Sequence, residues 1–234
     1  MLELHPVYAD DFLLVFDKPA GLLSVPGRGP DKQDCLSSRA QAMFDDALIV
    51  HRLDQATSGL LVMARGIAMQ RTLSAAFAQR HVLKRYLARV AGDARHGKDW
   101  QTIDLPIGLH WPDRPRRHID HPTGQASQTN WRCLAYDAHT HTSLLELEPL
   151  TGRTHQLRVH LSAVGFPICG DTLYASSEVA AASPRLLLHA HQLQLSHPVD
   201  ARPMAWVAPC AFADHQAAPT GWYGAAPDAV GAGH

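Results

Sequence analysis

Hydrophobic residues recur along the chain in short blocks separated by polar turns, a pattern typical of a sheet with a few helices. The apolar blocks predict strands at residues 13–16, 59–65, 85–90, 129–136, 143–147, 186–195 and 204–207. A turn at residues 138–140 separates two of these blocks, which are therefore expected to be adjacent strands. The pattern predicts an α+β fold around a largely antiparallel sheet.

One helix is predicted over residues 67–80, where Met69, Leu73 and Phe77 recur every four positions. These side chains would form one apolar face, and the basic residues of the segment lie off it. The segment should therefore pack against the sheet through this face.

Two further helices are indicated by signals at their ends. Asp34 is a suitable N-cap for a helix that runs to about Phe44. Another helix is predicted over residues 154–164 and should end at Gly165, since glycine favours the left-handed conformation found after many helices.

Two segments rich in glycine, proline and arginine are predicted to be exposed loops. Residues 27–30 carry Arg28, and residues 111–117 contain Pro112 and Pro115, which argue against regular structure there. The second loop is basic through Arg114, Arg116 and Arg117.

The charge of the chain is balanced as a whole but unevenly distributed. The formal net charge is −1, which by itself argues against a nucleic-acid binder. However, residues 65–89 contain six Lys or Arg and no Asp or Glu. The sequence is therefore compatible with one basic face on a neutral protein, although ordinary solvated charge would also account for the pattern.

Length and composition indicate one domain in a reducing compartment. The 234 residues are 46% hydrophobic, and no apolar run is long enough to cross a membrane. We expect a single catalytic domain over residues 1–213 and a disordered tail over residues 214–234, where Ala, Gly and Pro dominate. The four scattered cysteines form no CxxC pair, and residues 1–6 show no signal peptide, so we expect a cytoplasmic protein.

Candidate chemistry centres on residues 51–54, His-Arg-Leu-Asp. If this segment is extended, Arg52 and Asp54 project to the same side of the chain. A carboxylate beside a guanidinium could be reactive, but Asp54 could equally cap a turn with Arg52 as its solvated partner.

Five segments in order resemble the motifs of RluA-type pseudouridine synthases. They are residues 51–62, with His-Arg-Leu-Asp before Thr-Ser-Gly and an apolar strand, and residues 14–21, 84–90, 152–160 and 186–190. The resemblance covers about residues 8 to 210. It implies a mixed, mostly antiparallel sheet with a central RNA-binding cleft flanked by helices and loops. It also implies a reaction that converts uridine to pseudouridine in RNA without metal or organic cofactor.

By this resemblance, Asp54 is the catalytic aspartate, acting as a nucleophile or as the base that begins a glycal route. Arg158 would pair with Asp54, and Tyr86 would lie against the flipped uracil or remove its C5 proton. Arg52 would enter the RNA stack in place of the displaced base. Further RNA contacts are expected from His51, Arg28, Lys84, Arg114, Arg116, Arg117, Arg153 and His155.

Residues 21–28 and 111–115 resemble the RluA subgroup most, as does the expected lack of an S4 RNA-binding domain. The resemblance therefore implies a dual specificity, for a tRNA anticodon stem-loop and a 23S rRNA hairpin, and we expect a monomer. An enzyme for only one of these RNAs, a non-catalytic RNA-binding module and a sugar hydrolase remain alternatives. The hydrolase would need a second carboxylate on the other side of the scissile bond from Asp54.

A metal site is disfavoured by the spacing of the histidines. His155 and His160 are five residues apart, so they would not share a helical face as an i, i+4 pair does. His189 and His191 alternate on a predicted strand without an obvious acidic or cysteine partner.

Overall fold

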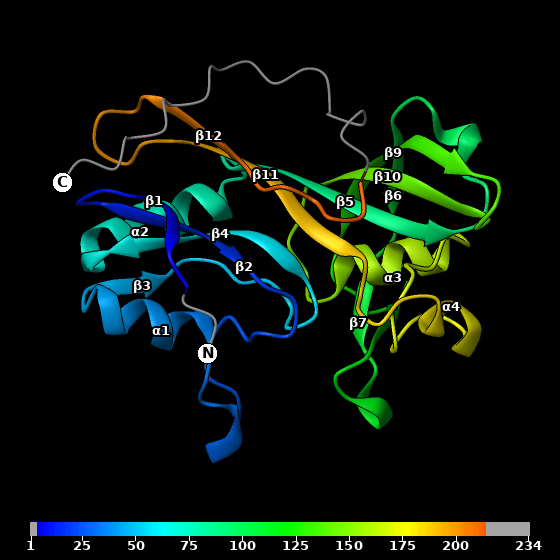
Figure 1. Ribbon diagram of the computed structural model, residues 1–234, viewed down its shortest axis with the longest axis horizontal. Helices are drawn as coiled ribbons and strands as arrows, with labels where there is room; N and C mark the ends of the chain where they lie inside the picture. The colour runs from blue at the N-terminus through cyan, green and yellow to red at the C-terminus, as the bar shows by residue number, and fades with distance from the viewer. Residues whose placement is uncertain (1–3, 214–234) are drawn as a thin grey trace.

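The computed structural model describes residues 4–213 and is built on one ten-stranded sheet (Figure 1). From edge to edge the strands are β1 (Pro6–Ala9), β2 (Leu13–Lys18), β4 (Ser58–Arg65), β11 (Leu188–Ser196), β5 (Leu83–Ala91), β10 (Thr142–Pro149), β9 (Gln128–Asp137) and β6 (Gln101–Asp104). Two more strands pair beside this path, β3 (Ala47–Ile49) with β4 and β12 (Pro203–Val207) with β11. The expected tail, residues 214–234, lies outside the described residues.

The strand directions confirm the predicted fold class. Strands β4 and β11 are parallel, and the other pairs in the sheet are antiparallel. The sheet is thus mixed and mostly antiparallel, and with the helices it makes an α+β fold.

Helices cover both faces of the sheet because its strands bury side chains on both sides. Helix α2 (Gly66–Ala78) packs Leu73 against Leu13 and Val15, together with the partly buried Met69 and Phe77. Helix α1 (Leu36–Met43) packs against the alternate residues of β2 and β4, including Phe16, on the opposite face. Helix α3 (Gln156–Ala163) packs against β5 and β10, and the short α4 (Ser177–Ala181) follows it.

Two predicted helix starts were wrong by one or two residues. Cys35, not Asp34, caps α1, since its Sγ accepts the N–H of Ser38. The Asp34 carboxylate instead binds the guanidinium of Arg39. Helix α3 begins at Gln156 rather than Thr154, because His155 adopts the left-handed conformation with φ of 57°.

The segment predicted to be irregular at residues 111–117 is partly regular. Trp111–Asp113 forms a 3-10 helix, which tolerates a proline in its first turn, and Arg117 begins β8 (Arg117–Ile119). Strand β8 pairs with β7 (Ile107–Leu109), so the segment is the tip of a hairpin.

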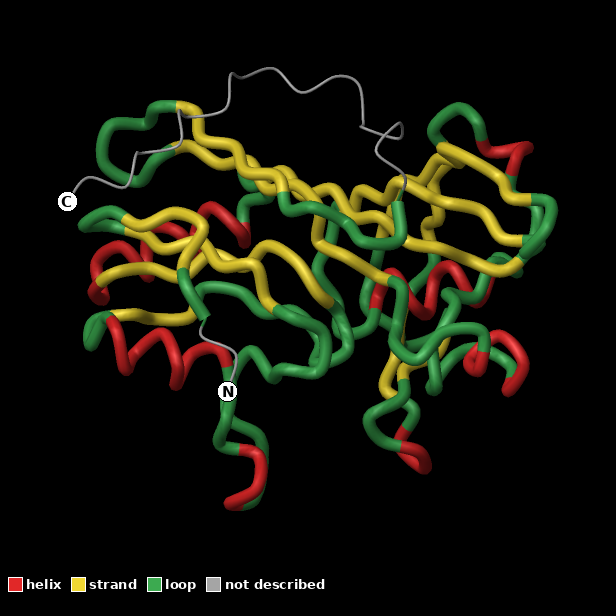
Figure 2. Tube along the Cα trace, in the orientation of Figure 1, coloured by secondary structure: helices red, strands yellow, loops and turns green. Residues whose placement is uncertain are grey.

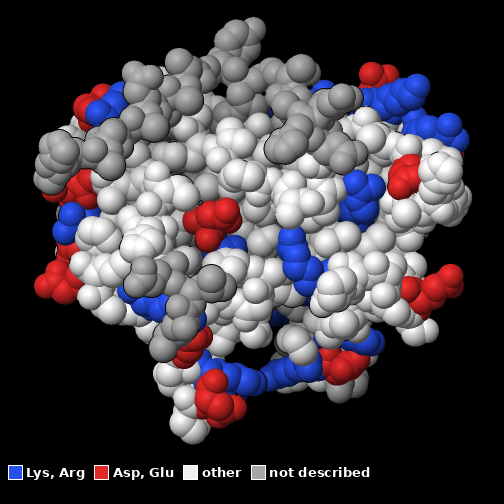
Figure 3. Space-filling model, viewed as in Figure 1, with Lys and Arg blue, Asp and Glu red and all other residues white. Residues whose placement is uncertain are grey.

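Two segments project from the same side of the molecule, one from each half of the sheet (Figures 1 and 2). One carries the 3-10 helix Pro30–Lys32, and the other is the β7–β8 hairpin with Trp111–Asp113 at its tip. Lys and Arg side chains gather between these two projections (Figure 3). The neutral chain therefore presents basic residues on this side, as its uneven charge distribution suggested.

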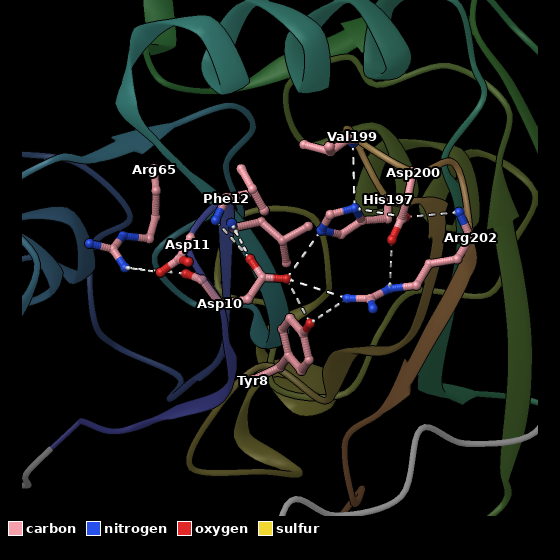
Figure 4. A network of polar contacts seen from close by, with 10 residues as sticks. Tyr8, Asp10, Asp11, Phe12, Arg65, His197, Val199, Asp200 and Arg202 are labelled. Carbon is pink, nitrogen blue, oxygen red and sulfur yellow. Dashed lines mark hydrogen bonds and ion pairs between the residues drawn. The ribbon is translucent and has the colours of Figure 1, made fainter.

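A partly buried polar network connects the turn between β11 and β12 to the first strands (Figure 4). The Asp10 carboxylate accepts hydrogen bonds from the Tyr8 hydroxyl and from the N–H groups of Phe12 and Leu13. It also lies 3.2 Å from Nε2 of His197, in the turn after β11. Burial would raise the pKa of Asp10, but these hydrogen bonds and His197 outweigh burial and lower it.

The two halves of the sheet meet along the short parallel pairing of β4 with β11. Only Ser58 with His189 and Gly59 with Ala190 are in register there. Gly59 has φ of 109°, and a Cβ at this position would collide with the Ala190 backbone. Glycine is therefore required where the two backbones approach.

Candidate active site

A cleft of about 600 Å³ lies between the two halves of the molecule. Its walls come from residues 51–57 on one side, residues 77–86 and Leu188 at the sheet, and residues 148–158 on the other side. Five cations and two carboxylates line it: Arg52, Arg80, Lys84, Arg153, Arg158, Asp54 and Glu148. The cleft is thus positively charged in a chain whose total charge is −1.

The segment that carries Asp54 is held by the turn that follows β2. The fully buried Lys18 donates hydrogen bonds to the carbonyls of Leu22 at 2.8 Å and Gln55 at 3.3 Å. Ser24 both donates to the carbonyl of Leu53 and accepts its N–H. These contacts fix the backbone on either side of Asp54.

Lys18 also interacts electrostatically with Asp54 in the cleft. Burial lowers the pKa of Lys18 to about 8, while Asp54 and Asp17 oppose this shift. A buried ammonium whose neighbours include Asp54 adds to the positive surroundings of that carboxylate.

The Asp54 carboxylate faces Arg158, as the resemblance implied. Oδ2 of Asp54 lies 3.5 Å from Nη1 of Arg158 and 3.9 Å from Nε2 of His155. The backbone carbonyl of Asp54, not its side chain, closes the local turn by accepting the N–H of Thr57. The alternative interpretation of Asp54 as a turn cap is therefore wrong.

Arg158 has a second, closer partner that sequence analysis missed. Its Nε and Nη2 donate to the two carboxylate oxygens of Asp171 at 2.8 and 2.7 Å. The side chains of Arg158 and Asp171 are only 5% and 1% exposed. Burial opposes the charge on Arg158, but Asp171 and then Asp54 outweigh it and raise the pKa of the guanidinium.

Tyr86 lies at the back of the cleft and joins the two halves. It is on β5, and its ring packs against the hydrophobic clusters on both sides of the β4–β11 pairing. Burial, and next the charge of Asp54, raise the pKa of Tyr86 well above its ordinary value of 10.0. The phenol therefore stays protonated at neutral pH.

Four of the predicted RNA-binding residues also line this cleft near Asp54. Arg52 and Arg153 are exposed at its rim, and Lys84 is partly buried on β5. His51 stacks on Phe77, and its Nε2 accepts the N–H of Val62, so both its ring and one nitrogen serve the fold. Burial, and next Lys84, lower the pKa of His51 to about 3, which keeps it neutral.

The remaining predicted RNA-binding residues lie on the two projecting segments, apart from His155 beside Asp54. Arg28 is exposed next to the 3-10 helix Pro30–Lys32. On the hairpin, the Arg114 guanidinium stacks on the exposed Trp111 ring at 3.6 Å, and Arg116 pairs with Asp113. Arg117 is partly buried on β8. The structure thus divides the predicted residues between a cleft and two projections.

Other candidate sites have structural explanations. Between residues 4 and 213, no cluster of His, Cys, Asp and Glu could hold a metal ion. His160 binds Thr129 and the Leu105 carbonyl, while His189 and His191 both bind the Ala208 carbonyl. None of the helices in the described part of the chain is long and apolar enough to cross a membrane.

Comparison with known proteins decides the family. The family model described as RNA pseudouridylate synthase matches residues 12–163, well over half of the chain. The chain belongs to this family. It is therefore an isomerase that converts uridine to pseudouridine in RNA, and the predictions of its family and reaction are confirmed.

Relatives of this pseudouridine synthase are similar over nearly their full length. The Escherichia coli (strain K12) protein named dual-specificity RNA pseudouridine synthase RluA is 44% identical over 206 residues, 88% of this chain and 93% of the relative. The Yersinia pestis protein of the same name is 44% identical over 198 residues, 85% and 95% of the two chains.

Solved structures agree with the fold. Human RNA Pseudouridylate Synthase Domain Containing 1 superposes with a TM-score of 0.73 at 30% identity, covering 88% of this chain and 83% of the human one. Human RNA Pseudouridylate Synthase Domain Containing 4 gives a TM-score of 0.69 at 26% identity, with 88% of both chains covered.

Proposed function

We propose that Asp54 is the catalytic carboxylate of this pseudouridine synthase and acts on a uridine flipped out of an RNA stem-loop. The observation that carries the proposal is the placement of Asp54 against the buried Arg158, inside a cleft lined by cations. The guanidinium holds and orients the carboxylate, which both a nucleophilic and a glycal route require. The cations that line the cleft favour binding of the phosphates on either side of the target nucleotide.

Tyr86 is assigned to stacking on the flipped uracil rather than to proton transfer. Its raised pKa makes its phenolate too scarce at neutral pH to serve as the base for the C5 proton. Its ring, in contrast, is fixed between two hydrophobic clusters at the back of the cleft. A fixed aromatic face gives an unstacked base a partner that replaces its neighbours in the RNA.

The two projections are assigned to the RNA backbone. They extend from the same side of the molecule with basic side chains between them (Figure 3). Arg28 on one and Arg114 and Arg116 on the other would contact phosphates of a compact hairpin. Arg52, at the cleft rim, would fill the gap left by the flipped uridine.

The proposed substrates are a tRNA anticodon stem-loop and a 23S rRNA hairpin. The support is the dual specificity in the names of relatives that share up to 44% of their residues with this chain. Action on one RNA alone is the alternative. Four free cysteines fit the reducing cytoplasm, where both RNAs occur, and we propose that the enzyme acts there as a monomer.

The proposal is tested by tritium release from RNA labelled at C5 of uridine, because that hydrogen leaves only when C5 becomes bonded to the ribose. The wild-type enzyme is expected to release tritium from both RNAs, and Asp54→Ala from neither. Asp45→Asn, which changes an exposed carboxylate outside the cleft, should behave as the wild type. Release from one RNA would reduce the specificity to that RNA, and unchanged release by Asp54→Ala would refute the catalytic assignment.

A further inference from the structure

A chain of three contacts leads from the basic hairpin to the carboxylate of Asp54. The N–H of Arg117, on β8, donates to the Tyr174 hydroxyl at 2.9 Å. That hydroxyl lies 2.6 Å from Nδ1 of His155, and Nε2 of His155 lies 3.9 Å from Oδ2 of Asp54. Neither Tyr174 nor this use of His155 was foreseen from the sequence.

The two hydrogen-bond partners of the Tyr174 hydroxyl indicate where the protons lie in this chain. The Tyr174 oxygen accepts the N–H of Arg117, and among the described residues the acceptor beside the hydroxyl proton is Nδ1 of His155. Nδ1 is therefore the acceptor, and the neutral imidazole carries its own proton on Nε2, the nitrogen that faces Asp54.

The surroundings of both side chains favour this arrangement. Burial lowers the pKa of His155, with Arg158 and Arg117 adding to the shift while Asp54 and Asp171 oppose it, so the ring is neutral at pH 7. Burial raises the pKa of Tyr174, which keeps its proton. A protonated phenol and a neutral imidazole are the states that the contact between them requires.

Both side chains are also held firmly. The Asp171 carboxylate accepts the N–H groups of Leu173 and Tyr174, and Ser162 donates to the Tyr174 carbonyl at 2.8 Å. His155 is held in the left-handed conformation at the start of α3. Such a conformation costs free energy and persists only where its surroundings enforce it.

We infer that Tyr174 and His155 are positioning residues for the proposed catalytic carboxylate. The tyrosine sets the tautomer of the histidine, and the Nε2–H of the histidine is aimed at Oδ2 of Asp54. Arg158 approaches the same oxygen at 3.5 Å. Both groups lie beside Oδ2, which leaves Oδ1 for the reacting uridine, and we expect the 3.9 Å separation of Nε2 from Oδ2 to shorten to a hydrogen bond when RNA fills the cleft.

The link through Arg117 ties this orientation to RNA contact. Arg117 follows Arg114 and Arg116 on the hairpin. RNA bound by these arginines would therefore affect the position of β8, whose Arg117 N–H donates to the Tyr174 hydroxyl. A correctly seated stem-loop and a correctly oriented carboxylate are thereby coupled. The inference rests on the proposed function of Asp54.

Tyr174→Phe tests the inference because it removes the hydroxyl and keeps the ring over Arg158. We expect kcat for tritium release to fall about 10- to 100-fold, the scale of a misoriented catalytic group, with KM for RNA little changed. The control is Tyr136→Phe, which removes an equivalent hydroxyl contact to Nδ1 of His141 on the exposed surface and should leave kcat unchanged.

Substitutions of His155 separate positioning from general structure. The amide nitrogen of His155→Gln reaches the place of Nε2, whereas that of His155→Asn reaches only the place of Nδ1. We expect the glutamine variant to keep kcat within about threefold of the wild type and the asparagine variant to lose about as much as Tyr174→Phe. Equal losses in the two variants would overturn the inference.

Nitrogen-15 NMR of the free enzyme tests the tautomer without any turnover. The His155 shifts should report a proton on Nε2 in the wild type and a mixture of tautomers in Tyr174→Phe. A proton on Nδ1 in the wild type would overturn the inference even if the enzyme is fully active. Absence of tritium release by the wild type would instead refute the proposed function, so the two failures are distinguishable.

Discussion

Replacing Asp171 with alanine should destabilise the protein far more than an ordinary surface substitution. Asp171→Ala leaves the Arg158 guanidinium, which is 5% exposed, without its bidentate partner. Breaking a buried ion pair by removing one partner costs about 3–5 kcal/mol, because the other charge stays buried. The N–H groups of Leu173 and Tyr174 lose their acceptor as well, which adds to the cost. The remaining contact of Arg158 with Asp54, at 3.5 Å, offsets part of it.

Urea unfolding followed by circular dichroism measures this cost. A loss of about 4 kcal/mol with an m value of about 2 kcal/mol/M lowers the unfolding midpoint by about 2 M. Asp34→Asn is the control, because it breaks a similarly short but exposed pair with Arg39 and should leave the midpoint unchanged.

A double variant separates lost charge pairing from lost packing. Arg158→Met with Asp171→Leu replaces both charges by apolar groups of similar size, so much of the stability should return although the enzyme is inactive. A midpoint shift of less than about 0.5 M in Asp171→Ala would refute the reasoning, since it would mean that Arg158 does not depend on this carboxylate.

Four further predictions concern other parts of the molecule. Gly59→Ala should unfold the protein or lower its urea unfolding midpoint severely, because the added Cβ meets the Ala190 backbone. Gly152→Ala, whose added Cβ has open space around it, should leave the midpoint unchanged in the same assay. Tyr86→Ala should lower tritium release about 10- to 100-fold through lost stacking, and Tyr86→Phe should stay near the wild type. Equal losses of tritium release in the two variants would show that the Tyr86 hydroxyl takes part in the reaction. Burial lowers the pKa of His189 to about 4, so on acidification the unfolded chain binds a proton at this residue before the folded protein does, and stability should fall as the pH drops from about 6.5 toward 4. Urea midpoints measured over this pH range should show the loss, and His189→Gln should make the loss smaller. Arg114→Ala should weaken RNA binding and reduce the slope of log K against log salt by about 0.7–0.9, while an unchanged slope would remove Arg114 from the phosphate contacts.

The parts of the fold that depend on local pattern were predictable from the sequence. Leu73 and its neighbours four residues away mark the apolar face of α2, and the apolar block at residues 59–65 is β4 almost to the residue. The cleft residues Asp54, Tyr86 and Arg158 came from motif resemblance, and the structure brings all three into one cleft.

What the sequence could not supply is set by contacts between distant segments. Asp171 has no local signal, because a single acid after a glycine resembles any turn residue until folding places it against Arg158. Tyr174 meets His155 and β8 only through the tertiary structure. The start of α3 was misplaced because His155 adopts the left-handed conformation, which no residue pattern in this segment signals.

The position of β11 in the sheet has a consequence for how the protein is made. This strand lies between β4 and β5, yet it follows them by roughly a hundred residues along the chain. While the ribosome is still adding those residues, the edges of β4 and β5 that later pair with β11 are unpaired. The strand that joins the two halves of the sheet does not yet exist. The cleft spans this junction and Leu188, the first residue of β11, lines it. A growing chain therefore cannot assemble its active site until β11 has emerged, and a partly made enzyme has no catalytic cleft with which to engage RNA.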